Sequence, residues 1–194
     1  MIVCLSSPAF LPPPTAAPPG SDITLLNDEN NVGNGTTLAI TFASVTAGSL
    51  VVISASRYSA SDTNNFVVGD MVPSGTASVG TLTLDAEAQS EAGADFYAQA
   101  GMWSLPITGD GNLTLTLTLG VGYAGRLVAE EYSGLDVSGT RVEDTESTFE
   151  NAVVPDAVIT SSNLIAAGGA LVTGCCSFTR GGAITTITEE AAWT

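Results

Sequence analysis

The sequence contains no lysine and no histidine, and its basic residues are four arginines. Without histidine, the chain lacks the side chain that most often serves as a general base or metal ligand. Without lysine, it can form neither a Schiff base nor the lysine contact of a P-loop. Carboxylates, hydroxyls and thiols remain, and two carboxylates across a cleft would suffice for a glycosidase. Because no such acid–base pair can be named, we expect a protein that is not an enzyme and needs no cofactor.

Basic charge is scarce, whereas 20 Asp and Glu residues give a net charge of -16. The arginines are too few and too scattered to form a phosphate-binding stripe; they are Arg57, Arg126, Arg141 and Arg180. We therefore expect no nucleic acid and no anionic membrane among the partners. The acidity fits a need for solubility, or a surface that attracts cations or basic partners.

Cysteine is also scarce, with Cys4, Cys175 and Cys176 an odd number without metal-ligand spacing. They form no disulfide framework, and the adjacent Cys175 and Cys176 are expected to be small buried hydrophobes. The first 20 residues lack the basic start of a signal peptide. Residues 157–179 carry no charge but contain too many polar residues and glycines for a membrane span. The positive mean hydropathy therefore indicates apolar surface buried against partners.

Residues 1–21 form a distinct segment, with no charged residue and six of the nine prolines. Proline removes backbone donors and favours extended geometry, so we predict an arm that stays outside sheet interiors. A disordered tail is the alternative, although such tails are usually polar and charged. The predicted assembly residues of the arm are Phe10, Leu11, Pro12, Pro13 and Pro14. The predicted organisation is an arm and lead-in over residues 1–35, followed by one β-domain over residues 36–194.

Strict alternation marks the clearest strand, in which Leu113, Leu115, Leu117 and Leu119 alternate with threonines. The glycines at positions 120, 122 and 125 predict a reversal before a second strand at residues 126–132. Residues 50–53 are apolar on both faces, which predicts a central strand. Further strands are predicted at residues 23–26, 36–42, 49–58, 66–68, 81–87, 96–105, 153–159, 170–179 and 183–188. Loops are predicted at residues 27–35 and 69–79, and an acidic loop that contains residues 143–150 is predicted after residue 136. This pattern predicts an all-β protein, an antiparallel and jelly-roll-like β-sandwich.

Four groups of residues are candidate sites. Asp85 and Glu87 are predicted on one solvent-facing strand face, where carboxylates could bind calcium or act in a glycosidase. Residues 110–112 (Asp-Gly-Asn) fit a hairpin turn better than a calcium loop. One of the adjacent Glu130 and Glu131 is expected to be partly buried near Arg126 or Tyr132, where it needs a partner. The aromatic residues of the strand at 96–105 fit a core better than a sugar platform.

The order of these motifs resembles a β-sandwich module of bacteriophage structural proteins and some bacterial surface proteins. The resemblance covers residues 36–194 and rests on AGSLVV at 47–52, the strand at 97–105, TGDGN at 108–112, LTLTLTL at 113–119, LVAEEYSGLD at 127–136, a strand at 171–172, and Trp193-Thr194. Such modules continue for another strand or two beyond the last motif. The resemblance therefore implies either that the module closes differently in this chain, or that an edge is completed by the N-terminal segment or by another subunit.

The resemblance implies a virion or adhesion role without catalytic residues. The expected function is a capsid decoration or cement protein on the outer capsid surface. The expected partners are the major capsid protein and copies of itself in a homo-oligomer such as a trimer. The alternative is a tail-fibre or adhesion module, in which Trp103, Tyr97 or Tyr123 would stack on a carbohydrate.

Overall fold

The computed structural model describes residues 2–6, 23–59, 65–89, 97–135, 137, 146–150 and 174–178. These residues form ten strands and one short 3-10 turn, η1 (Val68–Asp70), and no α-helix lies among them. Every strand pair in this part of the chain is antiparallel. The all-β, antiparallel class predicted from the sequence is confirmed.

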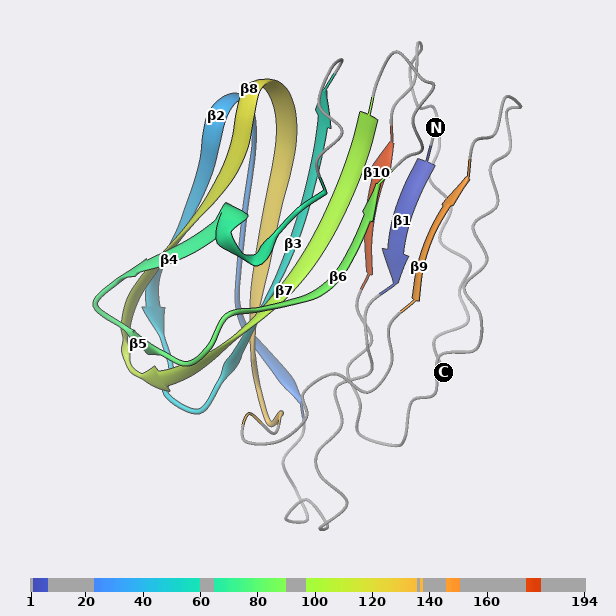
Figure 1. Cartoon of the computed structure of the whole chain (residues 1–194). Coiled ribbons are helices and arrows are strands. Elements are labelled where there is room, and N and C mark those ends of the chain that lie inside the picture. The colour runs from blue at the N-terminus through green and yellow to red at the C-terminus, as the bar shows by residue number, and fades with distance from the viewer. Residues whose placement is uncertain are drawn as a thin grey trace.

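Seven strands form one curled sheet in the order β2-β8-β3-β7-β5, with β4 paired to β8 and β6 paired to β7 (Figure 1). Their bounds are β2 Thr24–Val45, β3 Leu50–Ser59, β4 Met71–Gly75, β5 Ser78–Val79, β6 Thr83–Gln89, β7 Tyr97–Gly109 and β8 Gly111–Ser133. β4, an edge strand beside β8, and β5, an edge strand beside β7, follow each other directly in the chain. The sheet therefore curls far enough to bring these two edges close together.

The curled sheet has two parts, and two long strands, β2 and β8, run through both of them. The first part of β8 pairs with β4 and with the C-terminal part of β2, and the second part pairs with β3 and with the N-terminal part of β2. Between these parts, residues 119–122 of β8 face only Thr36 of β2. Gly120 has a φ of 90°, a conformation that favours glycine. The predicted reversal is thus a sharp bend within one strand, because a glycine-rich bulge lets both strands turn while they stay paired.

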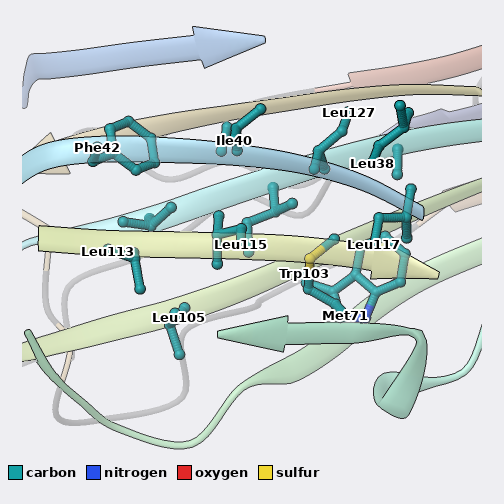
Figure 2. Close-up of a cluster of buried hydrophobic side chains, with 14 of the residues drawn as sticks. Leu38, Ile40, Phe42, Met71, Trp103, Leu105, Leu113, Leu115, Leu117 and Leu127 are labelled. Carbon is teal, nitrogen blue, oxygen red and sulfur yellow. The ribbon is translucent and has the colours of Figure 1, made fainter. Parts of the chain in front are cut away.

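The main hydrophobic core fills the space between the two parts of the curled sheet. The leucines of β8 at positions 113, 115, 117 and 119 all point into it and are buried, as the alternation predicted. Trp103 and Leu105 of β7 and Leu127 of the second part of β8 complete the cluster from the opposite side (Figure 2). One face of the Leu–Thr strand is therefore fully used for packing.

A second, smaller cluster lies on the other face of β3 and β7. Leu50 and Val52 of β3 pack there with Ala100 and Met102 of β7. Residues 51 and 53 of β3 point into the main core instead. The prediction that this strand is central and covered on both faces is confirmed, since β3 also has a hydrogen-bonded neighbour on each side.

A separate three-stranded sheet, in the order β10-β1-β9, lies beside β3, β6 and β7 (Figure 1). Its strands are β1 (Ile2–Ser6), β9 (Glu146–Glu150) and β10 (Gly174–Phe178). Since β1 pairs with a strand on each side, the expectation that residues 1–21 stay outside sheet interiors is wrong for residues 2–6. The physical reason is that the prolines begin only at Pro8, so β1 retains all its backbone donors.

Several boundaries differ from those predicted. The polar residues 27–34 belong to β2, which extends on both sides of residue 35 with a register shift between Gly35 and Thr37. β4 and β9 lie where loops were predicted, and β4 tolerates Pro73 because it pairs on one side only among the described strands. The short strand predicted at residues 66–68 is replaced by the approach to η1. The strands predicted at residues 153–159 and 183–188 lie outside the described residues.

Candidate functional site

The outer face of the β4-β8-β2 part of the sheet is an uncharged surface, which we call the threonine face. The register places its residues in adjoining rows: Val72, Thr116 and Ala39; Ser74, Thr114 and Thr41; and Thr118 beside Thr37. Successive residues of a strand point to opposite faces, so these side chains point away from the leucine core. Two of the hydroxyls, on Thr41 and Thr114, lie 2.9 Å apart and form a hydrogen bond.

The threonine face is accessible and carries no charge. Its Thr114 and Thr116 are half-buried and its other residues are exposed. Val72, near the middle of β4, is 51% exposed, and Val67 and Val68 before β4 are exposed as well. A surface without carboxylates is notable in a chain whose net charge is -16. It is the part of the described surface best suited to contact another protein without electrostatic repulsion.

The sequence predicts only part of this face. The Leu–Thr alternation places the threonines of β8 on one strand face, but Val72 and Ser74 belong to β4, where a loop was predicted. The local signal in β4 is weak, because only two apolar residues, Met71 and Val72, precede Pro73; of these, Met71 is buried. Proline concealed the strand because it is rare inside sheets.

Asparagine side chains of β2 cover part of the free edge of the same strand. Asn31 Nδ2 donates to the carbonyl oxygen of Ala39 at 2.9 Å, and Asn27 Nδ2 donates to that of Ser44 at 3.2 Å. These contacts join the two parts of the bent strand. They also occupy carbonyls that another strand would need for edge-to-edge pairing.

Glu131 is a fully buried carboxylate and forms the densest polar network of the described residues. Its Oε1 accepts hydrogen bonds from Ser49 Oγ at 2.6 Å and from the Thr46 backbone N–H at 2.7 Å, and its Oε2 accepts one from Asn27. One of the two adjacent glutamates is indeed buried, but these partners, rather than Arg126 or Tyr132, satisfy it. The network holds the turn before β3 against β2 and β8, which is a structural role.

The neighbouring Glu130 accepts a hydrogen bond from the Tyr132 hydroxyl at 2.9 Å. Burial raises the pKa of Tyr132 well above its usual value, and the hydrogen bond to Glu130 and the negative charge of this carboxylate add to the rise. Tyr132 therefore stays neutral at physiological pH.

Arg57 is the centre of a second buried polar group, at one end of the main core. Its Nε donates to Gln99 Oε1, and its guanidinium lies 4.2 Å from the ring centroid of Phe66. Asp70 Oδ2 lies 3.7 Å from Arg57 Nη2 and balances part of the positive charge of the guanidinium. Phe66 meets Trp103 edge to face, with centroids 5.2 Å apart. These contacts hold the segment before η1 against β3 and β7.

The predicted carboxylate pair, Asp85 and Glu87, does not exist. A register shift between Leu84 and Ala86 reverses the alternation of β6. Asp85 accepts a hydrogen bond from Ser104 Oγ at 3.1 Å, whereas Glu87 is opposite Gly101 on the other face of the sheet. Both residues are half-buried rather than exposed. The two carboxylates therefore cannot act on one substrate or ion.

Residues 110–112 form a tight connection, but not a hairpin, because β7 and β8 do not pair with each other. Asp110 Oδ1 accepts a hydrogen bond from the Ala47 backbone N–H at 2.7 Å, and Asn112 Oδ1 accepts one from that of Thr76 at 2.9 Å. Both side chains thus fix neighbouring turns. Within the described part of the chain, no group of three or more Asp, Glu, Cys or His residues could hold a metal ion.

Of the three aromatic residues proposed to stack on carbohydrate, the structure describes the side chain of Trp103, and it does not lie on the surface. Trp103 is fully buried in the main core, as expected for core packing. The side chains of Tyr97 and Tyr123 lie outside the described residues, as do the predicted assembly residues Phe10, Leu11, Pro12, Pro13 and Pro14.

Comparison with known proteins identifies no relative. No family model matches the chain, and no curated protein and no solved structure is significantly similar to it. The resemblance to a phage module therefore stays a prediction. No helix in the described ranges is long and apolar enough to cross a membrane.

Proposed function

We propose that this protein is a non-enzymatic structural component of a virus particle, a decoration or cement protein that binds the outer capsid surface and neighbouring copies of itself. The observation that carries the proposal is the threonine face, an exposed and uncharged surface on a chain with net charge -16. Acidic charge over the rest of the chain keeps the protein soluble and away from nucleic acid. Its partners would then be the major capsid protein and further copies of this chain.

A jelly-roll-like sandwich is the architecture we propose for the complete domain. The support is the curled sheet, whose two parts enclose one core cluster and whose β2 and β8 each run through both parts. In this proposal the arm begins after β1, and Phe10, Leu11 and Pro12–Pro14 contact a neighbouring subunit. An uncharged and apolar segment would lose little by leaving water at such a contact.

The experiment is co-sedimentation of the purified protein with particles that lack it. Wild type is expected to sediment with the particles, and the double variant Phe10→Ser with Leu11→Ser is expected to bind at least about tenfold more weakly, since two buried apolar side chains contribute about 1.5–3 kcal/mol each. Substitution is preferable to removal of residues 1–21, because removal would also delete β1. Failure of wild type to sediment with particles would contradict the proposed function. Undiminished binding of the double variant would remove the role of the arm alone.

A further inference from the structure

We propose, resting on the assembly role above, that the threonine face binds the same face of a second copy of this chain. The contact would be a two-fold, face-to-face packing of the β4-β8-β2 parts of two molecules. Three properties of the described residues lead to this partner: the distribution of charge, the chemistry of the face, and the state of the sheet edges.

Charge limits where two copies can meet. Each carries a net charge of -16, so surfaces that contain carboxylates repel each other at close range. At physiological ionic strength this repulsion is screened beyond about 8 Å, which leaves contact through an uncharged patch possible. The rows formed by Thr114, Thr116 and their neighbours provide such a patch on three adjacent strands.

The side chains of the face can pair with copies of themselves. A threonine hydroxyl both donates and accepts hydrogen bonds, so an array of threonines is complementary to an identical array. A two-fold contact requires this self-complementarity, because the same patch is used by both molecules. Val72, which is 51% exposed, would bury apolar surface in such a contact.

The edges of this part of the sheet are poorly suited to the alternative, strand-to-strand pairing. On β2, the carbonyls of Ala39 and Ser44 already accept hydrogen bonds from Asn31 and Asn27. On β4, Pro73 has no N–H to offer a new strand. The open face, rather than an edge, is therefore the route to association.

The test is the self-association constant of the full chain, measured by sedimentation equilibrium at about 0.05 M and about 0.5 M NaCl. Association through the uncharged face is expected to strengthen with salt, because salt screens the repulsion between acidic molecules. Val72→Asp places a carboxylate in the face of each copy and is expected to weaken association at least about tenfold. The matched control is Val32→Asp, an exposed valine (72%) in the other part of β2, which is expected to associate like wild type.

Three results would overturn the inference: a wild type that stays monomeric at both salt concentrations, an association that weakens with salt, or an equal loss in the two variants. These results are separable from the proposed function. A monomeric wild type that still binds particles would overturn the face-to-face contact and leave the decoration role standing. A wild type that pairs through Val72 but binds no particle would confirm the contact and contradict the decoration role.

Discussion

Two glutamates illustrate how the surroundings of a residue decide its contribution to stability. Glu131 is buried and has a hydrogen-bond donor on both oxygens. Glu87 accepts from Asn65 at 2.9 Å on one oxygen, while its Oε2 is buried and has no hydrogen-bond partner among the described residues. A buried carboxylate stabilises a fold only when donors replace the water it has lost.

The same conservative substitution should therefore have different effects at the two positions. Glu131→Gln places an amide N–H₂ among three donors and is expected to lower the free energy of unfolding by about 2–4 kcal/mol. Glu87→Gln removes a charge from a carboxylate that has one oxygen without a hydrogen-bond partner. It is expected to change the free energy of unfolding by less than about 1 kcal/mol. Urea unfolding at pH 7 measures both values. Equal losses in the two variants would show that the Glu131 network is not the stabilising element described here.

The raised pKa of Tyr132 leads to a prediction about folding stability at alkaline pH. Its pKa is raised in the folded protein, whereas in the unfolded chain it titrates near its usual value of about 10. Below pH 10 the Tyr132 hydroxyl is protonated in both the folded and the unfolded protein, so its contribution to folding stability is fully present. Above pH 10 the unfolded state loses the proton first, so folding stability falls as pH rises.

The measurement is the urea midpoint between about pH 9 and pH 11. Tyr132→Phe cannot ionise and is expected to lose stability less steeply than wild type, by less than about 1 kcal/mol per pH unit because the ring is only half-buried. Tyr58→Phe, at a ring that is 44% exposed, is the control and is expected to follow wild type. If stability falls with pH equally steeply in Tyr132→Phe and in wild type, Tyr132 is not the group that causes the alkaline loss of stability.

At the scale of elements, the bend of β2 and β8 depends on a close approach at Gly125. A Cβ atom there would lie 2.6 Å from Leu119 Cδ2 and 2.8 Å from the backbone oxygen of Ser56. Gly125→Ala is expected to cost about 1–3 kcal/mol of unfolding free energy, because a neighbouring backbone cannot move away easily. The control is Gly33→Ala at the paired position of β2, where the nearest atom is a side-chain carbon at 3.2 Å. A larger loss of unfolding free energy in Gly33→Ala than in Gly125→Ala would contradict the assignment of the steric constraint to Gly125 of β8.

Sequence patterns predicted the strands that have a strong local hydrophobic pattern, either alternating or continuous. The alternation in β8 and the apolar run at the start of β3 correctly identified which residues are buried. They could not predict that the glycines at 120–125 bend β8 instead of ending it, since the outcome depends on pairing with a distant strand. The bulge at Asp85 was missed for the same reason, and with it the opposite placement of Glu87.

Elements with weak local signals were missed altogether. β4 contains a proline, β9 lies in an acidic stretch that was predicted as a loop, and residues 27–34 of β2 are polar. Each is a strand because a neighbour supplies its hydrogen bonds. The threonine face could thus be foreseen on β8, but not its extension to Val72 on β4.

At the scale of the whole molecule, one face of β8 packs in the core and the other is the surface that we propose contacts partners. Leucines of β8 fill the core between the two parts of the curled sheet, and the threonines between them form an uncharged outer surface. The acidic side chains are excluded from that surface. Our main proposal is therefore that the inner face of β8 serves core packing and its outer face serves contact with partners.

The most direct test of this claim compares two exposed valines in the free protein and in the assembled particle. Hydroxyl-radical footprinting read out by mass spectrometry reports the solvent accessibility of Val72 in the threonine face and of Val32 in the other part of β2. The account predicts that assembly lowers labelling of Val72 at least about fivefold and leaves Val32 unchanged, because only the uncharged face is covered. Unchanged labelling of Val72, or protection of Val32 alone, would contradict it.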